Sequence, residues 1–443
     1  MADTICAIST PVGIGGIAIV RLSGDKAVEI VKKIFKKFPE NIESHKLYYG
    51  HIVFNNEIID EVLVSVMFSP KSYTREDVVE INCHGGYLIA KKILEILINL
   101  GARLAEPGEF TKRAFLNGRI DLIQAEAVVN VINSKNEISL KLFEKQLTGK
   151  TKKEIEKLKR EFIDISATLE SLIDFDEEIE EVSLESIKIK LQKNLEKIKK
   201  IIENYNSIKN FIEGVKIVIA GAPNSGKSSL LNYFLKKNRA IISDIPGTTR
   251  DTIEEEFYFK NIPVKLIDTA GIRETKNIIE KEGIKRAFEK IEEADIVIYL
   301  YDVTVGLKDF EKKIIKEKLK NKKVIICANK IDKIKDFKVK NAIPISIKEK
   351  INLGKLEKEI EKILEKDRFI SDESLIITNL RQLKIFENIK NIIESALKNF
   401  DNLYVDELSF EIKEILNELG KLTGEITSED ILDAIFSQFC IGK

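Results

Sequence analysis

The fold of the middle of the chain is decided by Val215–Ser229, which reads V-K-I-V-I-A-G-A-P-N-S-G-K-S-S. Its apolar run 217–220 predicts a buried parallel strand, and an apolar helical pattern begins at Leu230 and Leu231. Between them, residues 221–228 match G-x-x-x-x-G-K-[ST] in full, in the strand–loop–helix context that this motif requires. The stretch therefore predicts a phosphate-binding loop in preference to a chance glycine turn.

The loop carries the groups that a nucleoside triphosphate needs. Its glycines let backbone N–H groups curl around phosphate oxygens, and the N-terminus of the next helix adds a favourable dipole. We expect Lys227 to reach the β- and γ-phosphates as a catalytic group, and the Ser228 hydroxyl to bind Mg²⁺. The expected nucleotide-binding residues of the loop are Asn224, Ser225, Gly226, Lys227, Ser228 and Ser229.

Two downstream stretches indicate hydrolysis. Residues 268–271 read D-T-A-G after the strand-like run 264–267, and they place Asp268, Thr269, Ala270 and Gly271 near the phosphates. Asp268 suits a water-mediated Mg²⁺ contact, and the Gly271 N–H suits the γ-phosphate. Residues 247–251 read G-T-T-R-D in a predicted loop, which would bring Thr249 to the Mg²⁺.

A third stretch indicates guanine. Asn329, Lys330 and Asp332 lie in N-K-I-D, which follows the apolar run 324–328. The Asp332 carboxylate can accept two N–H bonds from the edge of guanine, and adenine offers no such pair. Ser346, after the strand-like run 342–345, is a further candidate for the base pocket. Because all four motifs occur in the expected order, the sequence predicts a GTPase.

Composition limits the remaining possibilities. The chain has 443 residues, with Lys+Arg and Asp+Glu both at 72, so its composition does not indicate a large uniform basic surface for nucleic acid, and any RNA contact would use a local patch. It has no apolar run of about 18 residues and no signal peptide, so we expect a cytoplasmic protein that does not enter a membrane. The cysteines are scattered, which favours reduced thiols over a structural zinc site: Cys6, Cys83, Cys327 and Cys440.

The pattern predicts a multidomain α+β and α/β chain. Residues 1–118 read as an α+β domain and 119–213 as the first part of an all-α helical domain. Residues 214–369 read as an inserted Ras-like P-loop domain, and 370–443 as the second helical part. The helical parts have apolar residues in steps of three and four, typical of long amphipathic helices. We expect a loop at 174–181 and a capping box at 427–430 that starts the last helix.

Taken together, the motifs resemble the MnmE family, also called TrmE. The resemblance covers nearly the whole length and depends on residues 221–229, 244–251 and 268–273, on Q-A-E-A at 124–127 and on C-I-G-K at 440–443. It implies a tetrahydrofolate-binding, dimerising N-terminal domain, so that the protein is a homodimer. It also implies a complex with the flavoprotein MnmG. Together the two proteins would add an aminomethyl or carboxymethylaminomethyl group to C5 of the wobble uridine of tRNA.

The same resemblance implies the cofactor site of the N-terminal domain. The one-carbon donor would be 5,10-methylenetetrahydrofolate, with 5-formyltetrahydrofolate as an analogue. The folate contacts fall on Arg21, Glu80, Arg119 and Lys443. Cations suit the glutamate tail and a carboxylate suits the amino groups of the pterin, although each residue could also form an ordinary surface ion pair. Other members of the family carry lysine at position 119, and arginine keeps the charge but not the geometry.

Ras-type GTPases orient the attacking water with a glutamine that follows D-x-x-G. This chain has Ile272 at that position, so another group has to orient the water. The resemblance assigns the catalytic role to Glu280 and places K⁺ where an arginine finger would act. It assigns K⁺ to the Asn224 side chain and to backbone oxygens of Ser243, Ile245 and Thr248. The GTP-binding positions of this loop are Ser243, Asp244, Ile245, Pro246, Gly247, Thr248 and Thr249.

Cys440 lies three residues before Lys443, with Phe439 and Ile441 as apolar anchors. Cysteines beside a cation can be good nucleophiles. We hypothesise that this tail reaches the folate site and that Cys440 serves the modification chemistry, as a nucleophile or by its position. His84, beside Cys83, could be a metal ligand or nucleophile, but its place before two glycines favours a structural role.

Two other classes remain open from sequence. A GTP-gated ribosome-assembly switch shares every GTPase motif, but it usually adds an RNA-binding module, and the G-x-x-G at 13–16 lacks the basic helical context of one. A membrane-anchored GTPase is the other alternative, because Cys440 lies four residues from the end as in prenylation. The terminal Gly442 and Lys443 fit that signal poorly.

Overall fold

The computed structural model describes twelve segments of the chain. It divides into two compact units, which are treated separately below. Unit 1 comprises 1–133, 143–192 and 391–443, and unit 2 comprises 134–142 and 193–390. The described residues are 3–11, 13–134, 136–174, 180–238, 254–259, 262–268, 289–317, 319–320, 322–334, 341–365, 375–402 and 404–443.

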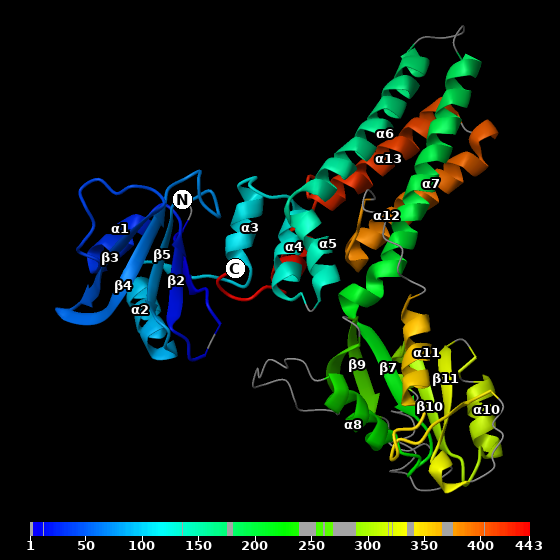
Figure 1. The fold of residues 1–443 in the computed structure, drawn as a ribbon. Coiled ribbons are helices and arrows are strands. Elements are labelled where there is room, and N and C mark those ends of the chain that lie inside the picture. The colour runs from blue at the N-terminus through cyan, green and yellow to red at the C-terminus, as the bar shows by residue number, and fades with distance from the viewer. Residues whose placement is uncertain are drawn as a thin grey trace. The chain divides into compact units, whose positions relative to one another are not determined.

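Unit 1 begins with a six-stranded sheet in the order β3-β4-β5-β2-β1-β6 (Figure 1). Buried and exposed residues alternate along its strands, as on β4, where Val62 and Val64 are buried and Leu63 is exposed. Two helices, α1 (Ala27–Ile34) and α2 (Tyr87–Asn99), share one core with the buried face. The strands are β1 (Ile5–Ile8), β2 (Ile17–Ser23), β3 (Lys46–Phe54), β4 (Glu57–Met67), β5 (Val78–His84) and β6 (Arg103–Leu104).

Long helices make up the rest of unit 1. The helix α13 packs along α6, and both have buried apolar residues at helical spacing, such as Phe162 and Leu169 on α6 and Ile412 and Leu419 on α13. The helices α5, α7 and α12 each have residues in both units. The bounds are α3 (Glu109–Leu116), α4 (Leu122–Ile132), α5 (Glu137–Leu147), α6 (Lys150–Asp174), α7 (Glu180–Glu213), α12 (Leu380–Lys398), α13 (Val405–Thr423) and α14 (Glu429–Phe436).

Two local predictions about the helices need correction. The helix α14 begins where expected, but Ser428 is its N-cap residue and makes no side-chain cap bond, so the predicted capping box does not form. The expected loop at 174–181 is wrong at both ends, because Asp174 belongs to α6 and α7 starts at Glu180, and residues 175–179 lie outside the described part of the chain. Charged residues occur both in loops and at solvent-facing helix ends, so the acidic composition of 174–181 did not show where α6 ends and α7 begins.

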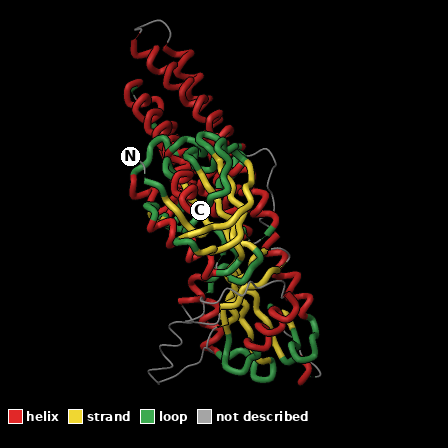
Figure 2. Tube along the Cα trace, turned by 90° about the vertical axis from the view of Figure 1, so that its left-hand side faces the viewer, coloured by secondary structure: helices red, strands yellow, loops and turns green. Residues whose placement is uncertain are grey.

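Unit 2 contains a second six-stranded sheet, in the order β12-β11-β10-β7-β9-β8. All neighbouring strands are parallel except β8 and β9, which run antiparallel. Unit 2 also contains the helices α8 (Lys227–Asn238), α10 (Asp309–Glu317) and α11 (Leu353–Glu365). Figure 2 shows helices in red and strands in yellow. The strands are β7 (Val215–Ala220), β8 (Glu254–Phe259), β9 (Ile262–Asp268), β10 (Ile296–Asp302), β11 (Lys323–Asn329) and β12 (Ile343–Pro344).

The predicted fold class is confirmed, with an α+β N-terminal part, long helices and a Ras-like α/β sheet. In unit 2 the sheet has apolar residues on both faces, and β10 is buried from Ile296 to Tyr301. Strands buried on both faces are typical of parallel α/β sheets, whose ligand sites form at the carboxyl ends of the strands. The boundaries of the four predicted domains stay a prediction.

Candidate functional site

The phosphate-binding loop follows the central strand of the unit 2 sheet. β7 lies between β10 and β9, and the chain turns at Gly221 into the loop that ends where α8 begins at Lys227. Gly221 has φ +145°, and a side chain there would come within 2.0 Å of the Leu300 carbonyl oxygen. Only glycine fits this position, because neither the backbone angle nor the neighbouring strand allows a Cβ atom.

Two side chains of the loop are buried at its centre. Lys227 is 8% exposed, and its Nζ atom donates to the carbonyl oxygens of Gly221 at 3.2 Å and Ala222 at 2.9 Å. Ser225 is 1% exposed, and its hydroxyl has no hydrogen-bond partner among the described residues. A buried ammonium and an unpartnered hydroxyl in a loop at a helix N-terminus fit an anionic ligand.

The base-recognition motif is tied directly to this loop. Asn329 Nδ2 donates to the Ser225 carbonyl oxygen at 2.8 Å, and Asn329 Oδ1 accepts from the Ile347 N–H at 3.2 Å. Lys330 adopts φ +68°, and its Nζ atom donates to the Asn224 carbonyl oxygen at 2.8 Å. Asn329 is 4% exposed, so its amide is committed to these bonds. The motif therefore fixes the phosphate loop and the base pocket relative to each other.

Asp332 and Ser346 meet at the outer end of the pocket. The Ser346 hydroxyl donates to Asp332 Oδ1 at 2.6 Å, and the Glu349 N–H donates to that hydroxyl at 3.2 Å. The bond from Ser346 is the main reason that the pKa of Asp332 lies below its ordinary value. An ionised, exposed carboxylate held by a fully buried serine is a suitable acceptor for the N–H edge of guanine.

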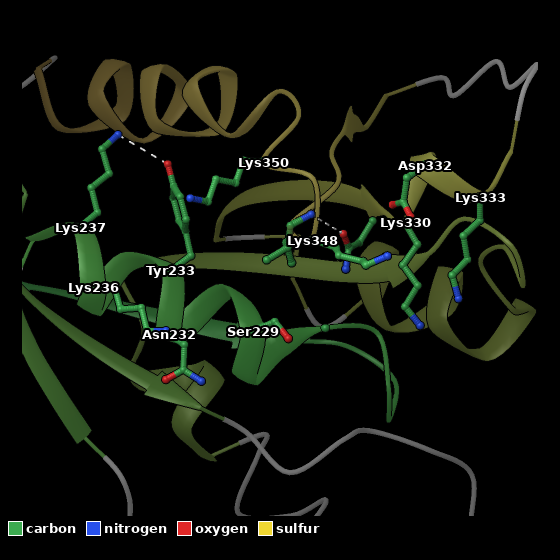
Figure 3. A pocket seen from close by; sticks show the side chains of 13 residues that line it. Ser229, Asn232, Tyr233, Lys236, Lys237, Lys330, Asp332, Lys333, Lys348 and Lys350 are labelled. Carbon is green, nitrogen blue, oxygen red and sulfur yellow. Dashed lines mark hydrogen bonds between the residues drawn. The ribbon is translucent and has the colours of Figure 1, made fainter.

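A cavity of about 880 Å³ lies between the base motif and α8 (Figure 3). Its walls include Asn232, Tyr233 and Lys236 of α8 and Lys348 of the facing loop, which the sequence motifs did not predict. Ser229, Tyr233 and Lys236 have the i, i+4, i+7 spacing of one helix face, and this spacing was the available signal. Tyr233 also donates to Glu357 of α11 at 3.0 Å, which holds its ring at the edge of the cavity.

Several predicted site residues lie outside the described part of the chain. They are Ser243, Asp244, Ile245, Pro246, Gly247, Thr248 and Thr249, then Thr269, Ala270, Gly271 and Glu280. Asp268 ends β9, the strand beside β7, but its side chain is not described. Of the predicted cation ligands, Ser228 stands in the first turn of α8 and Asn224 lies at the exposed tip of the loop with φ +63°.

The predicted folate residues of unit 1 gather around the chain end. Arg21 of β2 faces Glu80 of β5 across the sheet, and its Nε and Nη2 atoms lie 2.8 and 2.7 Å from Glu80 Oε1. Arg21 Nη1 also donates to the Gly442 carbonyl oxygen at 3.5 Å. The last residues are docked on the N-terminal part, since Ile441 bridges Pro107, and the C-terminus lies beside α3 in Figure 1.

The other two folate candidates differ in what they contact. Arg119 Nη1 donates to the Tyr73 carbonyl oxygen at 3.2 Å, and its guanidinium carbon lies 4.7 Å from the centre of the Tyr73 ring. The Lys443 N–H donates to the Cys440 carbonyl oxygen at 3.3 Å, which turns the chain end back on itself. Tyr73 was not predicted from sequence as a site residue, because no motif singles out this position.

The four cysteines fall into two groups. Cys6, Cys83 and Cys327 are buried, and burial raises their pKa values to about 12, 11 and 12. Cys440 is exposed, on the docked tail. His84 is bonded through Nδ1 to Asp60 Oδ1 at 2.8 Å, which agrees with a structural role for this histidine. Within the described segments, no helix is long and apolar enough to cross a membrane.

A mostly parallel α/β sheet, a glycine loop after one of its inner strands and an Asn–Asp base motif define a P-loop GTPase. The family model described as MnmE helical domain matches residues 122–440, and the model described as GTP-binding protein TrmE N-terminus matches residues 4–119. Together they account for almost the whole chain. The chain belongs to the MnmE family of tRNA modification GTPases.

Two relatives that carry the name of this family match over the whole chain. The tRNA modification GTPase MnmE of Carboxydothermus hydrogenoformans is 44% identical over 461 residues, which cover 100% of both chains. The protein of the same name from Acetivibrio thermocellus is 44% identical over 456 residues, with 100% of this chain and 99% of the relative covered. Among solved structures, a variant of Era from Aquifex aeolicus is 29% identical over 40% of this chain and 66% of its own, with a TM-score of 0.29.

Proposed function

We propose that this protein is a K⁺-activated GTP hydrolase that acts with a MnmG-type flavoprotein. The two would add a carboxymethylaminomethyl or aminomethyl group to C5 of the wobble uridine in certain tRNAs. A one-carbon tetrahydrofolate would supply the carbon. The observation that supports the GTP part is the set of bonds from Asn329 to the Ser225 carbonyl and the Ile347 N–H, and from Ser346 to Asp332, because it links the phosphate loop to a carboxylate that suits guanine.

The residues of the loop would each do one part of GTP binding. Lys227 would exchange its bonds with the Gly221 and Ala222 carbonyls for bonds to the β- and γ-phosphates, because a phosphate oxygen is the stronger acceptor. Backbone N–H groups from 222–228 would bind the remaining phosphate oxygens. Asn329 would keep the loop in the shape that accepts them, since it already holds the Ser225 carbonyl.

Two cations belong to the proposal. Mg²⁺ would be held by Ser228, Thr249 and, through water, Asp268. K⁺ would be held by Asn224, Ser243, Ile245 and Thr248. Cations between the phosphates supply charge neutralisation as the bond to the γ-phosphate breaks. The exposed positions of Ser228 and Asn224 around the loop support this assignment, and Glu280 is proposed to orient the attacking water.

The folate part is supported by the contacts of Arg21 with Glu80 and with the docked tail. Arg21, Arg119 and Lys443 supply cations for the glutamate tail of folate, and Glu80 supplies a carboxylate for the pterin. Because Arg21 bonds both Glu80 and the Gly442 carbonyl, the tail that carries Cys440 is held beside these groups. We therefore propose that 5,10-methylenetetrahydrofolate binds here and that Cys440 serves the transfer of its carbon.

The proposed assembly is a homodimer bound to MnmG-type subunits and to tRNA. A cytoplasmic location fits the free cysteines, three of which are buried as thiols.

The decisive experiment is mass spectrometry of wobble nucleosides. A bacterial strain that lacks its own MnmE is complemented with this chain, and bulk tRNA is digested to nucleosides. We expect the modified wobble uridine to return, and a Lys227→Ala variant to fail. Full GTP hydrolysis by a purified protein that never restores the nucleoside would contradict the proposal and favour a switch GTPase without modification chemistry.

A further inference from the structure

We propose that Tyr73 is a positioning residue of the proposed folate site, whose aromatic ring holds the Arg21 and Arg119 guanidinium groups in place. The inference rests on the proposed function, because it concerns the folate site described above. Tyr73 lies between β4 and β5, and neither motif nor comparison assigns it a role. All its partners belong to unit 1.

The ring of Tyr73 is the feature that the two cations share. The Arg119 guanidinium carbon lies 4.7 Å from the ring centre and the Arg21 guanidinium carbon lies 5.8 Å from it. Both distances are within the range of a cation–π contact. Arg21 also lies 5.7 Å from the centre of the Phe110 ring, which is fully buried. Two like charges are thus held near one another by the negative face of an aromatic ring.

The loop that carries Tyr73 is fixed on several sides. The Tyr73 hydroxyl lies 3.0 Å from the hydroxyl of buried Thr111, so the outer end of the ring is held. The next residue, Thr74, has a buried hydroxyl contact with Ser23 at 2.6 Å, and its carbonyl oxygen accepts from Asn117 Nδ2 at 2.7 Å. A ring supported by such contacts can position two flexible arginines at little entropic cost.

The geometry also explains why arginine suits position 119. Its planar guanidinium approaches the Tyr73 ring and at the same time donates through Nη1 to the Tyr73 carbonyl oxygen at 3.2 Å. A lysine ammonium is a single point charge and cannot make both contacts with the same geometry. Tyr73 and Arg119 therefore act as a pair, and a change in either should weaken the same ligand contact.

The test is the affinity of the full-length protein for 5-formyltetrahydrofolate, measured by isothermal titration calorimetry. Tyr73→Leu removes the ring and should weaken binding about tenfold, the effect of losing cation–π support for two charges. Tyr73→Phe keeps the ring and should bind within a factor of about two of wild type. Phe400→Leu is the matched control. It removes a cation–π contact in the helical part, where Lys188 Nζ lies 5.2 Å from the centre of the Phe400 ring, away from the proposed folate site.

A double-mutant cycle separates positioning from general loss of structure. Arg119→Lys changes an exposed residue, so it should leave folding intact and weaken folate binding about fivefold. In the Arg119→Lys background, Tyr73→Leu should reduce folate affinity much less than it does in the wild-type background. GTP hydrolysis and thermal stability of each variant report whether folding has been disturbed. A positioning role predicts that only folate binding changes.

The outcomes are distinct. If wild type does not bind 5-formyltetrahydrofolate, the proposed folate site is wrong and the inference falls with it. If wild type binds and Tyr73→Leu binds equally well, the inference alone is wrong. Two further outcomes would overturn it. The first is that the losses of affinity in the cycle are strictly additive. The second is that Tyr73→Phe loses as much affinity as Tyr73→Leu. In either case the Tyr73 ring would not act on Arg119.

Discussion

Asp332 is the side chain on which nucleotide choice should depend. Its carboxylate is ionised, exposed and held by the Ser346 hydroxyl at 2.6 Å. Asp332→Asn replaces an acceptor with a donor where guanine presents N–H groups, so GTP affinity should fall about 10- to 100-fold, the loss expected for hydrogen bonds to a charged group. Xanthosine triphosphate, which has an acceptor there, should bind better to the variant. Titration with both nucleotides checks this, and unchanged preferences would show that Asp332 does not read the base.

Glu280 is a prediction from the resemblance and lies outside the described residues. Ile272, which follows D-x-x-G, cannot orient a water molecule, so another group has to do so. Glu280→Ala should keep GTP affinity and lower kcat by a factor on the order of 10², the range for a lost general base or water-orienting group. Glu282→Ala is the matched control and should be near wild type. Single-turnover hydrolysis measures both, and reversed results would move the role to Glu282.

The motifs predicted the residues that backbone spacing determines. Asn329, Asp332 and Ser346 follow strands, and a parallel sheet brings the carboxyl ends of its strands together, so their meeting was foreseeable. Tyr73 was not foreseen, because its contacts with Arg21 and Arg119 depend on packing between distant segments and have no fixed spacing in sequence. Tyr233 had a signal, because it lies four residues after Ser229 on one helix face. Arg21 and Glu80 are paired in register across two strands, which sequence alone could not specify.

At the scale of elements, the long and strongly patterned segments were the predictable ones. The strand β7 contains the predicted run 217–220 and begins two residues earlier, at Val215, since a short apolar run identifies a buried strand directly. The two-residue strand β6 and the eight-residue helix α1 were not predicted. They are too short for a clear period, and their formation depends on packing against neighbours such as β1.

The phosphate loop and the loop at 243–249 should act together through a monovalent cation. K⁺ would offset the charge that develops on the bridging oxygen during hydrolysis, and Asn224 would contribute a side-chain oxygen. Replacing Na⁺ with K⁺ at equal ionic strength should therefore raise kcat strongly, on the order of tenfold or more. Asn224→Ala should flatten this response, while Asn206→Ala, at an exposed position on α7 away from the cavity, should retain it. Equal wild-type rates in both salts would exclude the cation site.

The C-terminal tail is an element whose docking depends on Gly442. This residue has φ +95°, and a Cβ atom would come within 2.5 Å of the Ile8 carbonyl oxygen. Gly442→Ala should release the tail without unfolding the domain, because only the last residues need to move. Carboxypeptidase should then remove the terminal residues at least several-fold faster than from wild type. Gly13→Ala, with no atom within 4 Å of the added carbon, should digest at the wild-type rate; equal rates for both variants would mean that the tail is not docked.

At the scale of the whole molecule, the phosphate-binding loop and the residues proposed for the modification chemistry belong to different units. The cavity at the base motif is lined by residues between Gly226 and Lys350 of unit 2, and the proposed folate residues with the docked tail are in unit 1. The chemistry of one unit can therefore be removed without removing that of the other. A variant that separates the two activities is the strongest test of the proposed function.

Cys440 offers that separation. It is exposed on a tail held by Arg21 and Gly108, so Cys440→Ser changes little volume and should leave folding intact. We expect GTP hydrolysis near the wild-type rate and loss of the modified wobble uridine in a complemented strain, because a hydroxyl is a far weaker nucleophile than a thiol at neutral pH. Gln438→Ala, a neighbouring exposed change, should retain both activities. A parallel fall in hydrolysis would make Cys440 a structural residue, and full modification in Cys440→Ser would show that the thiol takes no part in the chemistry.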